Sequence, residues 1–148
     1  MSTGGASPGT VIGIDYGSRR IGVAATDPLR ILASGAGTFE NAATFFEVLK
    51  RIVTERSAVL IVVGMPYSAD GGKGEKAREV DRFIVELQER IPLPVATWDE
   101  SNSSVEARRV MAGSGMKRKK RQEKGRVDEM AARLLLQEFV DAGCPVGS

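Results

Sequence analysis

Acidic residues stand at three points of the sequence where a strand is expected to end or a helix to begin. Asp15 ends an apolar run near the N-terminus, Asp99 and Glu100 end a second run, and Asp128 lies in the first turn of the last expected helix. An ionised carboxylate at the end of a buried strand needs a hydrogen-bonding partner or a cation, because its desolvation is costly. Each acid also has a purely structural interpretation, as part of a turn or as a partner of the helix dipole.

Taken together, the acids predict a metal-dependent site. Asp15, Glu100 and Asp128 in one cluster would repel one another unless divalent cations neutralised them. Hard oxygen ligands without histidine suit Mg²⁺ or Mn²⁺, and two such ions about 4 Å apart are a recognised device for phosphodiester hydrolysis. Strand alternation turns Asp99 away from Glu100, which makes Glu100 the expected ligand. A bulge at the strand end would exchange the two, so Asp99 remains a further candidate ligand.

A dense basic run lies between residues 116 and 126. It holds seven of the chain's 21 Lys and Arg residues: Lys117, Arg118, Lys119, Lys120, Arg121, Lys124 and Arg126. So many like charges repel one another, which predicts a loop rather than regular structure unless a polyanion compensates them. A solvated face is the alternative interpretation, but the density favours contact with nucleic acid. Because no aromatic residue interrupts the run, we expect phosphate neutralisation rather than base stacking.

Composition limits the remaining choices. The chain of 148 residues has one cysteine, Cys144, and no histidine, which excludes a disulfide framework, Ser-His or Cys-His nucleophiles and His-ligated zinc. It has no secretory leader and no apolar run long enough to span a bilayer, so we expect a cytoplasmic protein that does not bind a membrane. A glycine-rich segment at residues 68–74 does not match a phosphate-binding P-loop.

Apolar periodicity predicts a single α/β domain over residues 10–141, between a disordered leader at residues 1–9 and a flexible tail at residues 142–148. Three closely spaced strands, Thr10–Tyr16, Ile21–Thr26 and Ile31–Thr38, should form an antiparallel meander. Asn41 is the expected N-cap of the helix that follows.

Parallel strands and helices should complete the domain. The run Val59–Val63 is continuously apolar, as in a strand covered on both faces, and Val95–Trp98 is a second strand after an amphipathic helix. A capping box predicts a short helix at residues 104–112. The last helix should start near Val127, with Asp128 pointing inward and a buried stripe formed by Val127, Met130, Ala131, Leu134 and Leu135.

Five segments, taken in order, carry a family resemblance. The chain resembles the YqgF/RuvX family of Holliday-junction resolvases in Gly13–Ala24, Val63–Pro66, Asp99–Glu100, Ser104–Arg108 and Lys124–Asp128. The resemblance implies a ribonuclease H-like fold, with a mixed five-stranded sheet flanked by helices. It also implies a nuclease that matures the precursor of 16S ribosomal RNA or cuts branched DNA. The sequence departs from the family at Ser101, where members have an arginine.

Carried over residue by residue, the resemblance makes Asp15, Glu100 and Asp128 the metal ligands. It also places Arg19 and Arg20 beside the first acid, where they join the expected nucleic-acid-binding residues. Ribosomal RNA precursor is the favoured partner and junction DNA the alternative, for which a homodimer would suit a symmetric junction. A kinase-like ATPase opens with a similar strand and acid but needs two domains, and a binding module with a degenerate site is the remaining alternative.

Overall fold

The computed structural model describes residues 9–67, 72–100 and 120–145, with the backbone alone described for residues 120–127. Its centre is a five-stranded sheet in the order β4-β3-β2-β5-β6. Strands β2 (Thr10–Asp15), β3 (Arg20–Thr26) and β4 (Ala33–Glu40) form an antiparallel meander. Strands β5 (Ala58–Met65) and β6 (Val95–Asp99) continue the sheet in parallel with β2. The mixed five-stranded sheet expected from the sequence is therefore confirmed.

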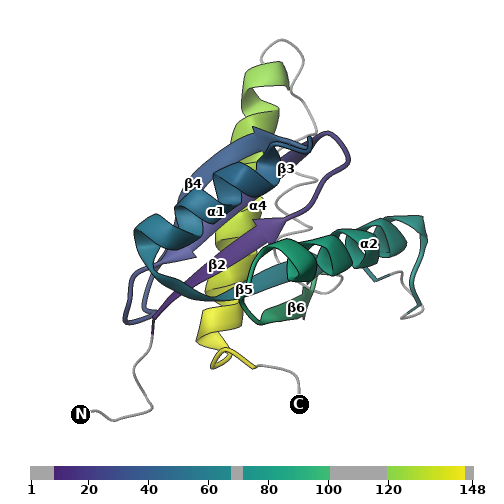
Figure 1. Ribbon diagram of the computed structural model, residues 1–148. Coiled ribbons are helices and arrows are strands. Elements are labelled where there is room, and N and C mark those ends of the chain that lie inside the picture. Colours follow the sequence, from purple (N-terminus) through teal and green to yellow (C-terminus); the bar gives the residue numbers. More distant parts are fainter. Residues whose placement is uncertain (1–8, 68–71, 101–119, 146–148) are drawn as a thin grey trace.

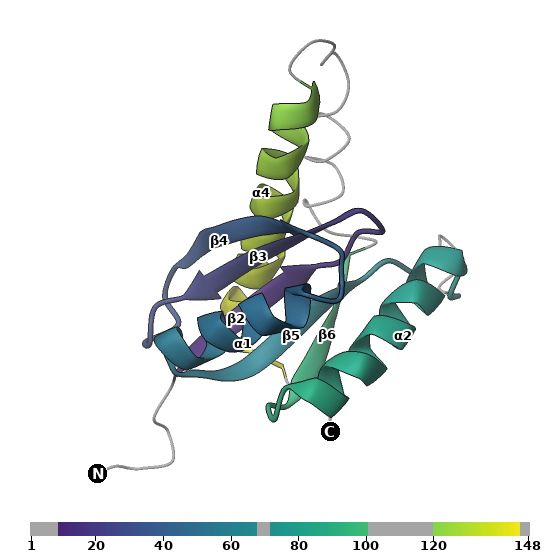
Figure 2. The ribbon, with the colours of Figure 1, turned by 45° about the horizontal axis from the view of Figure 1, so that its top comes forward.

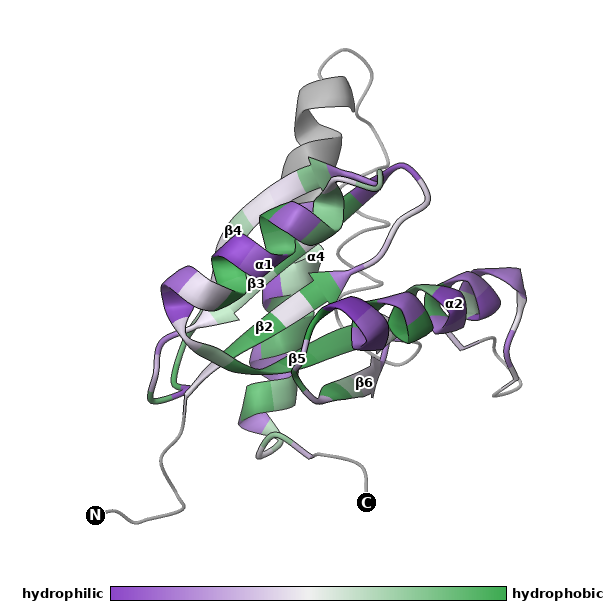
Figure 3. Ribbon diagram, in the orientation of Figure 1, coloured by the Kyte–Doolittle hydropathy of each residue, from purple (hydrophilic) through white to green (hydrophobic). Residues whose placement is uncertain are grey.

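Helices cover both faces of this sheet (Figures 1 and 2). Helices α1 (Phe45–Arg56) and α2 (Glu75–Arg90) lie on one face, and α4 (Lys120–Asp141) crosses the other. Figure 3 shows the strands β2 and β5 largely in hydrophobic colours, while α2 alternates between hydrophilic and hydrophobic residues. That alternation is typical of a helix with one face on a core and one in water. No helix in the described part of the chain is long and apolar enough to cross a membrane.

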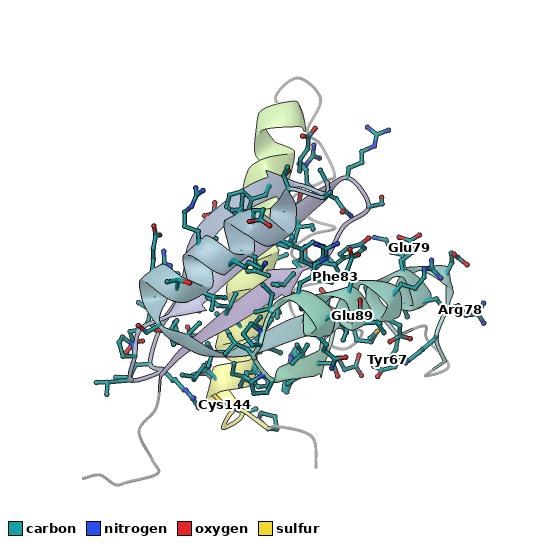
Figure 4. All side chains as sticks on the ribbon, in the orientation of Figure 1. Tyr67, Arg78, Glu79, Phe83, Glu89 and Cys144 are labelled. Atoms are coloured by element: carbon teal, nitrogen blue, oxygen red, sulfur yellow. The ribbon has the colours of Figure 1, made fainter. Side chains whose placement is uncertain are left out.

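The face under α1 and α2 carries the larger core. Phe83 reaches from the inner side of α2 (Figure 4), with its ring centroid 4.6 Å from that of Tyr16, 6.1 Å from Phe45 and 5.9 Å from Phe46. Leu49 of α1 is fully buried in the same cluster. Aromatic and aliphatic side chains of this size remove much apolar area from water, so this face contributes most of the hydrophobic stabilisation.

The face under α4 combines aliphatic sheet residues, Val11, Leu60 and Val62, with small ones. A Cβ atom added to Gly13 would come within 2.8 Å of the Leu136 side chain, so the helix lies almost on the backbone of β2. Ala24 and Ala96 also belong to this cluster, which α4 completes with Leu135 and other apolar residues. Small residues on the sheet let α4 approach closely, and this closeness determines where its first turns lie.

Two predictions in and beside the meander differ clearly from the structure. Strand β4 begins at Ala33, two residues later than expected, because the Asp27 carboxylate accepts hydrogen bonds from the backbone of residues 29, 31 and 32 and holds them in a loop. Asn41 is not a helix cap, since α1 is preceded by Thr44. The Asn41 side chain instead donates a hydrogen bond to the Gly17 carbonyl at 2.8 Å, which ties β4 to the turn after Asp15.

The last helix also differs from the prediction. It begins at Lys120 rather than near Val127, so residues 120–126 of the basic run are helical. Lys, Arg, Gln and Glu are strong helix formers, and this preference outweighs the charge repulsion on which the prediction rested. The buried stripe is shifted too, because Met130 is 38% exposed and Leu134 only half-buried. The fully buried residues are Ala131, Ala132, Leu135, Leu136 and Phe139. The helix expected at residues 104–112 lies outside the described residues.

Candidate active site

Asp15 is the last residue of β2 and is buried, with 4% of its surface exposed. The antiparallel register places it directly opposite Gly22 of β3. On the other side, the register that pairs Ile14 with Val63 brings Asp15 to the level of Gly64 in β5. Gly13 faces α4, so Asp15, two residues later, projects from the same face. The Asp15 carboxylate therefore lies between two glycines, on the sheet face that α4 covers.

Glu100 follows β6 and is buried as well, with 3% of its surface exposed. Its backbone N–H donates to the Met65 carbonyl at 3.1 Å, which continues the parallel pairing by one residue. A Cβ atom added to Gly64 would come within 2.7 Å of the Glu100 carboxyl carbon, so this carboxyl group lies directly over Gly64. Since Asp15 is the neighbour of Gly64 across the sheet, the structure brings Asp15 and Glu100 together on one face.

Asp99, by contrast, is exposed. Consecutive residues at a strand end point to opposite sides, and no bulge disturbs the register between β5 and β6 from Ile61 to Met65. The environments of Asp99 and Glu100 therefore differ as strand alternation requires. The choice between them as metal ligand stays a prediction, which the buried position of Glu100 supports.

Asp128 approaches the site from α4. Its main-chain carbonyl lies against Gly22, so closely that no Cβ atom would fit there. Its side chain is 24% exposed and forms an ion pair with Arg20, with 3.3 Å between Nε and Oδ2. The helix thus places Asp128 beside the strand residue that faces Asp15, while the Asp128 carboxylate is directed to Arg20.

Glu129, the next residue of α4, anchors this turn of the helix to the edge strand. Its Oε2 atom accepts a hydrogen bond of 3.0 Å from the Gly37 N–H, and its carboxyl group lies over Gly35. Sequence reasoning missed Glu129 and the glycines beneath the helix. Glycines inside strands, at positions 13, 22, 35 and 64, were the available signal, since such glycines mark close approach of another chain segment.

The chemistry of these side chains suits a hard divalent cation. Asp15 and Glu100 supply oxygen donors, and a side chain at Gly64 would displace one of them. The third acid is not part of the arrangement, because no three acidic or cysteine residues in the described ranges lie close enough together to hold a metal ion. Arg20 provides the physical reason, since its guanidinium group holds Asp128. Two of the three expected ligands are thus adjacent, and the third is next to them but ion-paired.

The basic residues lie around the same edge of the molecule. Arg19 is exposed in the turn after β2, and Arg20 is half-buried in its ion pair. Lys120, Arg121, Lys124 and Arg126 fall in the first turns of α4, which project beyond the sheet in Figures 1 and 2. Lys117, Arg118 and Lys119 lie outside the described residues.

Comparisons with known proteins agree with this architecture. The family model RuvX, described as Holliday junction resolvase, matches residues 9–142. A protein of Chlorobium luteolum is 48% identical over 90% of this chain and 94% of its own length, and one of Chlorobaculum tepidum is 44% identical over 89% and 93%. Both are named "Putative pre-16S rRNA nuclease".

Solved structures extend the comparison to the fold. Thermus thermophilus RuvC has a TM-score of 0.52 at 12% identity, with 90% of this chain and 96% of that chain covered. RuvC of the same organism in complex with a Holliday junction substrate gives a TM-score of 0.50. At this identity the likeness concerns the arrangement of strands and helices, and it agrees with the mixed sheet described above.

Proposed function

The chain belongs to the RuvX family of Holliday junction resolvases, and from this membership we propose that it is a divalent-metal-dependent endonuclease that hydrolyses phosphodiester bonds in the precursor of 16S ribosomal RNA. The observation that carries the proposal is the pair of buried carboxylates, Asp15 and Glu100, on one sheet face with Asp128 beside them. Buried acids in such proximity are expected where they bind a cation rather than where they only support a fold.

In this proposal Asp15, Glu100 and Asp128 hold Mg²⁺ or Mn²⁺, which would activate a water molecule and stabilise the charge on the scissile phosphate. Arg19, Arg20 and the cations at the start of α4 hold the polyanion that the acids alone would repel. The protein would act in the cytoplasm, in keeping with a single cysteine, which cannot form a disulfide within the chain.

The choice of RNA rests on the names of the curated relatives, both of which refer to pre-16S rRNA. A second candidate function is the resolution of branched DNA, which the family description and the RuvC-like fold favour. A symmetric junction would then suit a homodimer. Phosphate contacts serve either substrate, so the two functions must be separated by experiment.

The test compares cleavage of a 16S rRNA precursor and a four-way DNA junction by the pure protein with Mg²⁺ or Mn²⁺. We expect cleavage of the precursor and little or no cleavage of the junction. Efficient, structure-selective cutting of the junction alone would establish the second function instead. ATP turnover, or nucleic-acid binding without any metal-dependent cleavage, would reject both in favour of a kinase-like enzyme or a binding module.

Acid variants assign the site within the same assay. Asp15→Asn, Glu100→Gln and Asp128→Asn should each reduce cleavage by more than about 100-fold, since changes around metal ligands already cost about 10–100-fold. Thermal melting should show a retained fold. Asp99→Asn is the matched control, and it should keep most activity because Asp99 is exposed. Normal cleavage by the Asp15 or Asp128 variant would disprove the three-acid centre.

A further inference from the structure

The ion pair between Arg20 and Asp128 joins two residues with opposite expected functions. Arg20 is an expected phosphate contact and Asp128 an expected cation ligand. In this structure, however, the two side chains bind each other, with 3.3 Å between Nε and Oδ2. Arg20 precedes Gly22 by two residues, so its side chain lies on the same sheet face as α4. Because β2 ends at Asp15, opposite Gly22, Arg20 stands just beyond the end of β2. The Asp128 carboxylate is thereby directed to a side chain beyond the end of β2.

The main chain around Asp128 is held independently of this ion pair. Its carbonyl rests on Gly22, and the neighbouring Glu129 side chain binds the Gly37 N–H of β4 at 3.0 Å. Neither contact involves the Asp128 carboxylate. Rotation of the Asp128 side chain alone can therefore change its partner, while α4 stays where it is.

We propose that Arg20 is a latch that couples nucleic-acid binding to cation binding. In the protein without nucleic acid, Arg20 holds Asp128 and leaves the cation site with two adjacent acids. A bound phosphate takes over the Arg20 guanidinium, and the released Asp128 becomes the third ligand. The inference rests on the proposed function and makes Arg20 a positioning residue for its metal site.

Physical chemistry favours such an exchange. The two side chains are 32% and 24% exposed, and a partly solvated ion pair held by one Nε contact is weak. Arginine binds phosphate through two parallel hydrogen bonds, which makes a phosphate the stronger competitor. Once the guanidinium has turned to the phosphate, the freed carboxylate lies beside two other acids and gains most from a cation.

Linkage gives the latch a measurable signature. If nucleic acid raises the affinity for the cation by some factor, the cation must raise the affinity for nucleic acid by the same factor. The experiment measures Mn²⁺ binding to the full chain from the electron paramagnetic resonance signal of free Mn²⁺. It is done with and without a saturating phosphorothioate oligoribonucleotide, whose integrity is checked on a gel.

The unmodified protein should bind Mn²⁺ about 5- to 150-fold more tightly with the oligonucleotide, the usual range of such coupling. Arg20→Met should bind Mn²⁺ more tightly without oligonucleotide and lose nearly all of the coupling. Arg20→Lys should keep part of it, since lysine is a cation without the planar fork. Arg56→Met is the matched control, because Arg56 is an exposed arginine at the end of α1 with no ion pair among the described residues.

A double-mutant cycle separates the latch from general electrostatics. The gain in Mn²⁺ affinity from Arg20→Met should disappear when Asp128→Asn is also present, because the two residues then no longer act on each other. A gain that persists in the Asp128→Asn background, or an unmodified protein without coupling, would overturn the latch. A protein that binds no Mn²⁺ under any condition would instead overturn the proposed metal site itself.

Discussion

The two faces of the sheet are built on opposite principles. The face under α1 and α2 is filled by large side chains, including Phe45, Phe83 and Leu49. The face under α4 has glycine and alanine beside Val11, Leu60 and Val62 on the sheet, and at the glycines the helix and the carboxyl groups touch strand backbone. The comparison indicates that the face under α1 and α2 provides stability. The face under α4 has less apolar volume, and its small residues let acids lie close together. Substitutions should therefore act differently on the two faces.

The largest effect on stability is expected on the face under α1 and α2. Leu49→Ala should lower the free energy of unfolding by about 2–5 kcal/mol, because it leaves a cavity in a fully buried cluster. The rate of cleavage by the folded fraction should stay close to normal. Urea unfolding combined with single-turnover cleavage measures both quantities. Lys50→Ala, on the exposed side of the same helix, is the control and should change neither.

Gly22→Ala probes the face under α4 and should affect cleavage more than stability, the reverse of Leu49→Ala. The added methyl group would meet the Asp128 carbonyl, which is backbone and cannot move without α4. Overpacking of this kind lowers the free energy of unfolding by about 1–3 kcal/mol. The displaced helix also carries Asp128 away from Asp15, so the loss of cleavage rate, expressed as a free energy, should exceed the loss of stability. Gly74→Ala serves as the control, because it has open space around it but stands at the N-cap of α2, so it should lower stability and leave cleavage unchanged. A Gly22→Ala protein that is destabilised yet fully active would contradict the idea that the face under α4 positions the acids.

Local periodicity and the positions where strands end allowed the antiparallel meander, the later strands, most helices and the convergence of Asp15 and Glu100 to be predicted. The five-stranded mixed sheet was implied by the family resemblance. It did not reveal the partner of Asp128. Arg20 and Asp128 are 108 residues apart in the chain, and their contact depends on how closely α4 approaches β3 over Gly22. Such a distance is set by packing between elements rather than by the pattern within either one.

Charge in the basic run between residues 116 and 126 gives a smaller and more selective effect. Replacing Lys117, Arg118, Lys119 and Lys120 with Ser should flatten the slope of log affinity against log salt for nucleic acid. If each cation neutralises one phosphate, the slope should fall by roughly three to four, at about 0.9 per phosphate on duplex DNA or 0.7 on single strands. Filter binding at several salt concentrations measures it. An unchanged slope would mean that the basic run is a solvated face. Other residues would then bind the nucleic acid.

The smallest effect is expected at Asp27, a carboxylate remote from the acidic cluster. Its oxygens accept hydrogen bonds from the backbone N–H groups of Leu29 at 3.1 Å, Ile31 at 2.9 Å and Leu32 at 2.8 Å. These bonds, that from Leu32 above all, hold the pKa of Asp27 below its usual value of 3.8. This acid is satisfied by the backbone of its own loop, so we expect it to support structure rather than chemistry.

A group whose pKa is lower in the folded protein than in the unfolded chain stabilises the fold above the unfolded pKa. That stabilisation is lost as the pH falls through the folded pKa. Asp27→Asn should therefore slightly lower the Tm at pH 7, leave cleavage unchanged, and bring the Tm difference from the unmodified protein toward zero as the pH falls below about 4. Thermal melting between pH 3 and pH 7 measures this. A Tm difference independent of pH would show that the ionised carboxylate adds nothing to the stability of the loop. A loss of cleavage would show that Asp27, at the opposite end of the sheet, also takes part in the reaction.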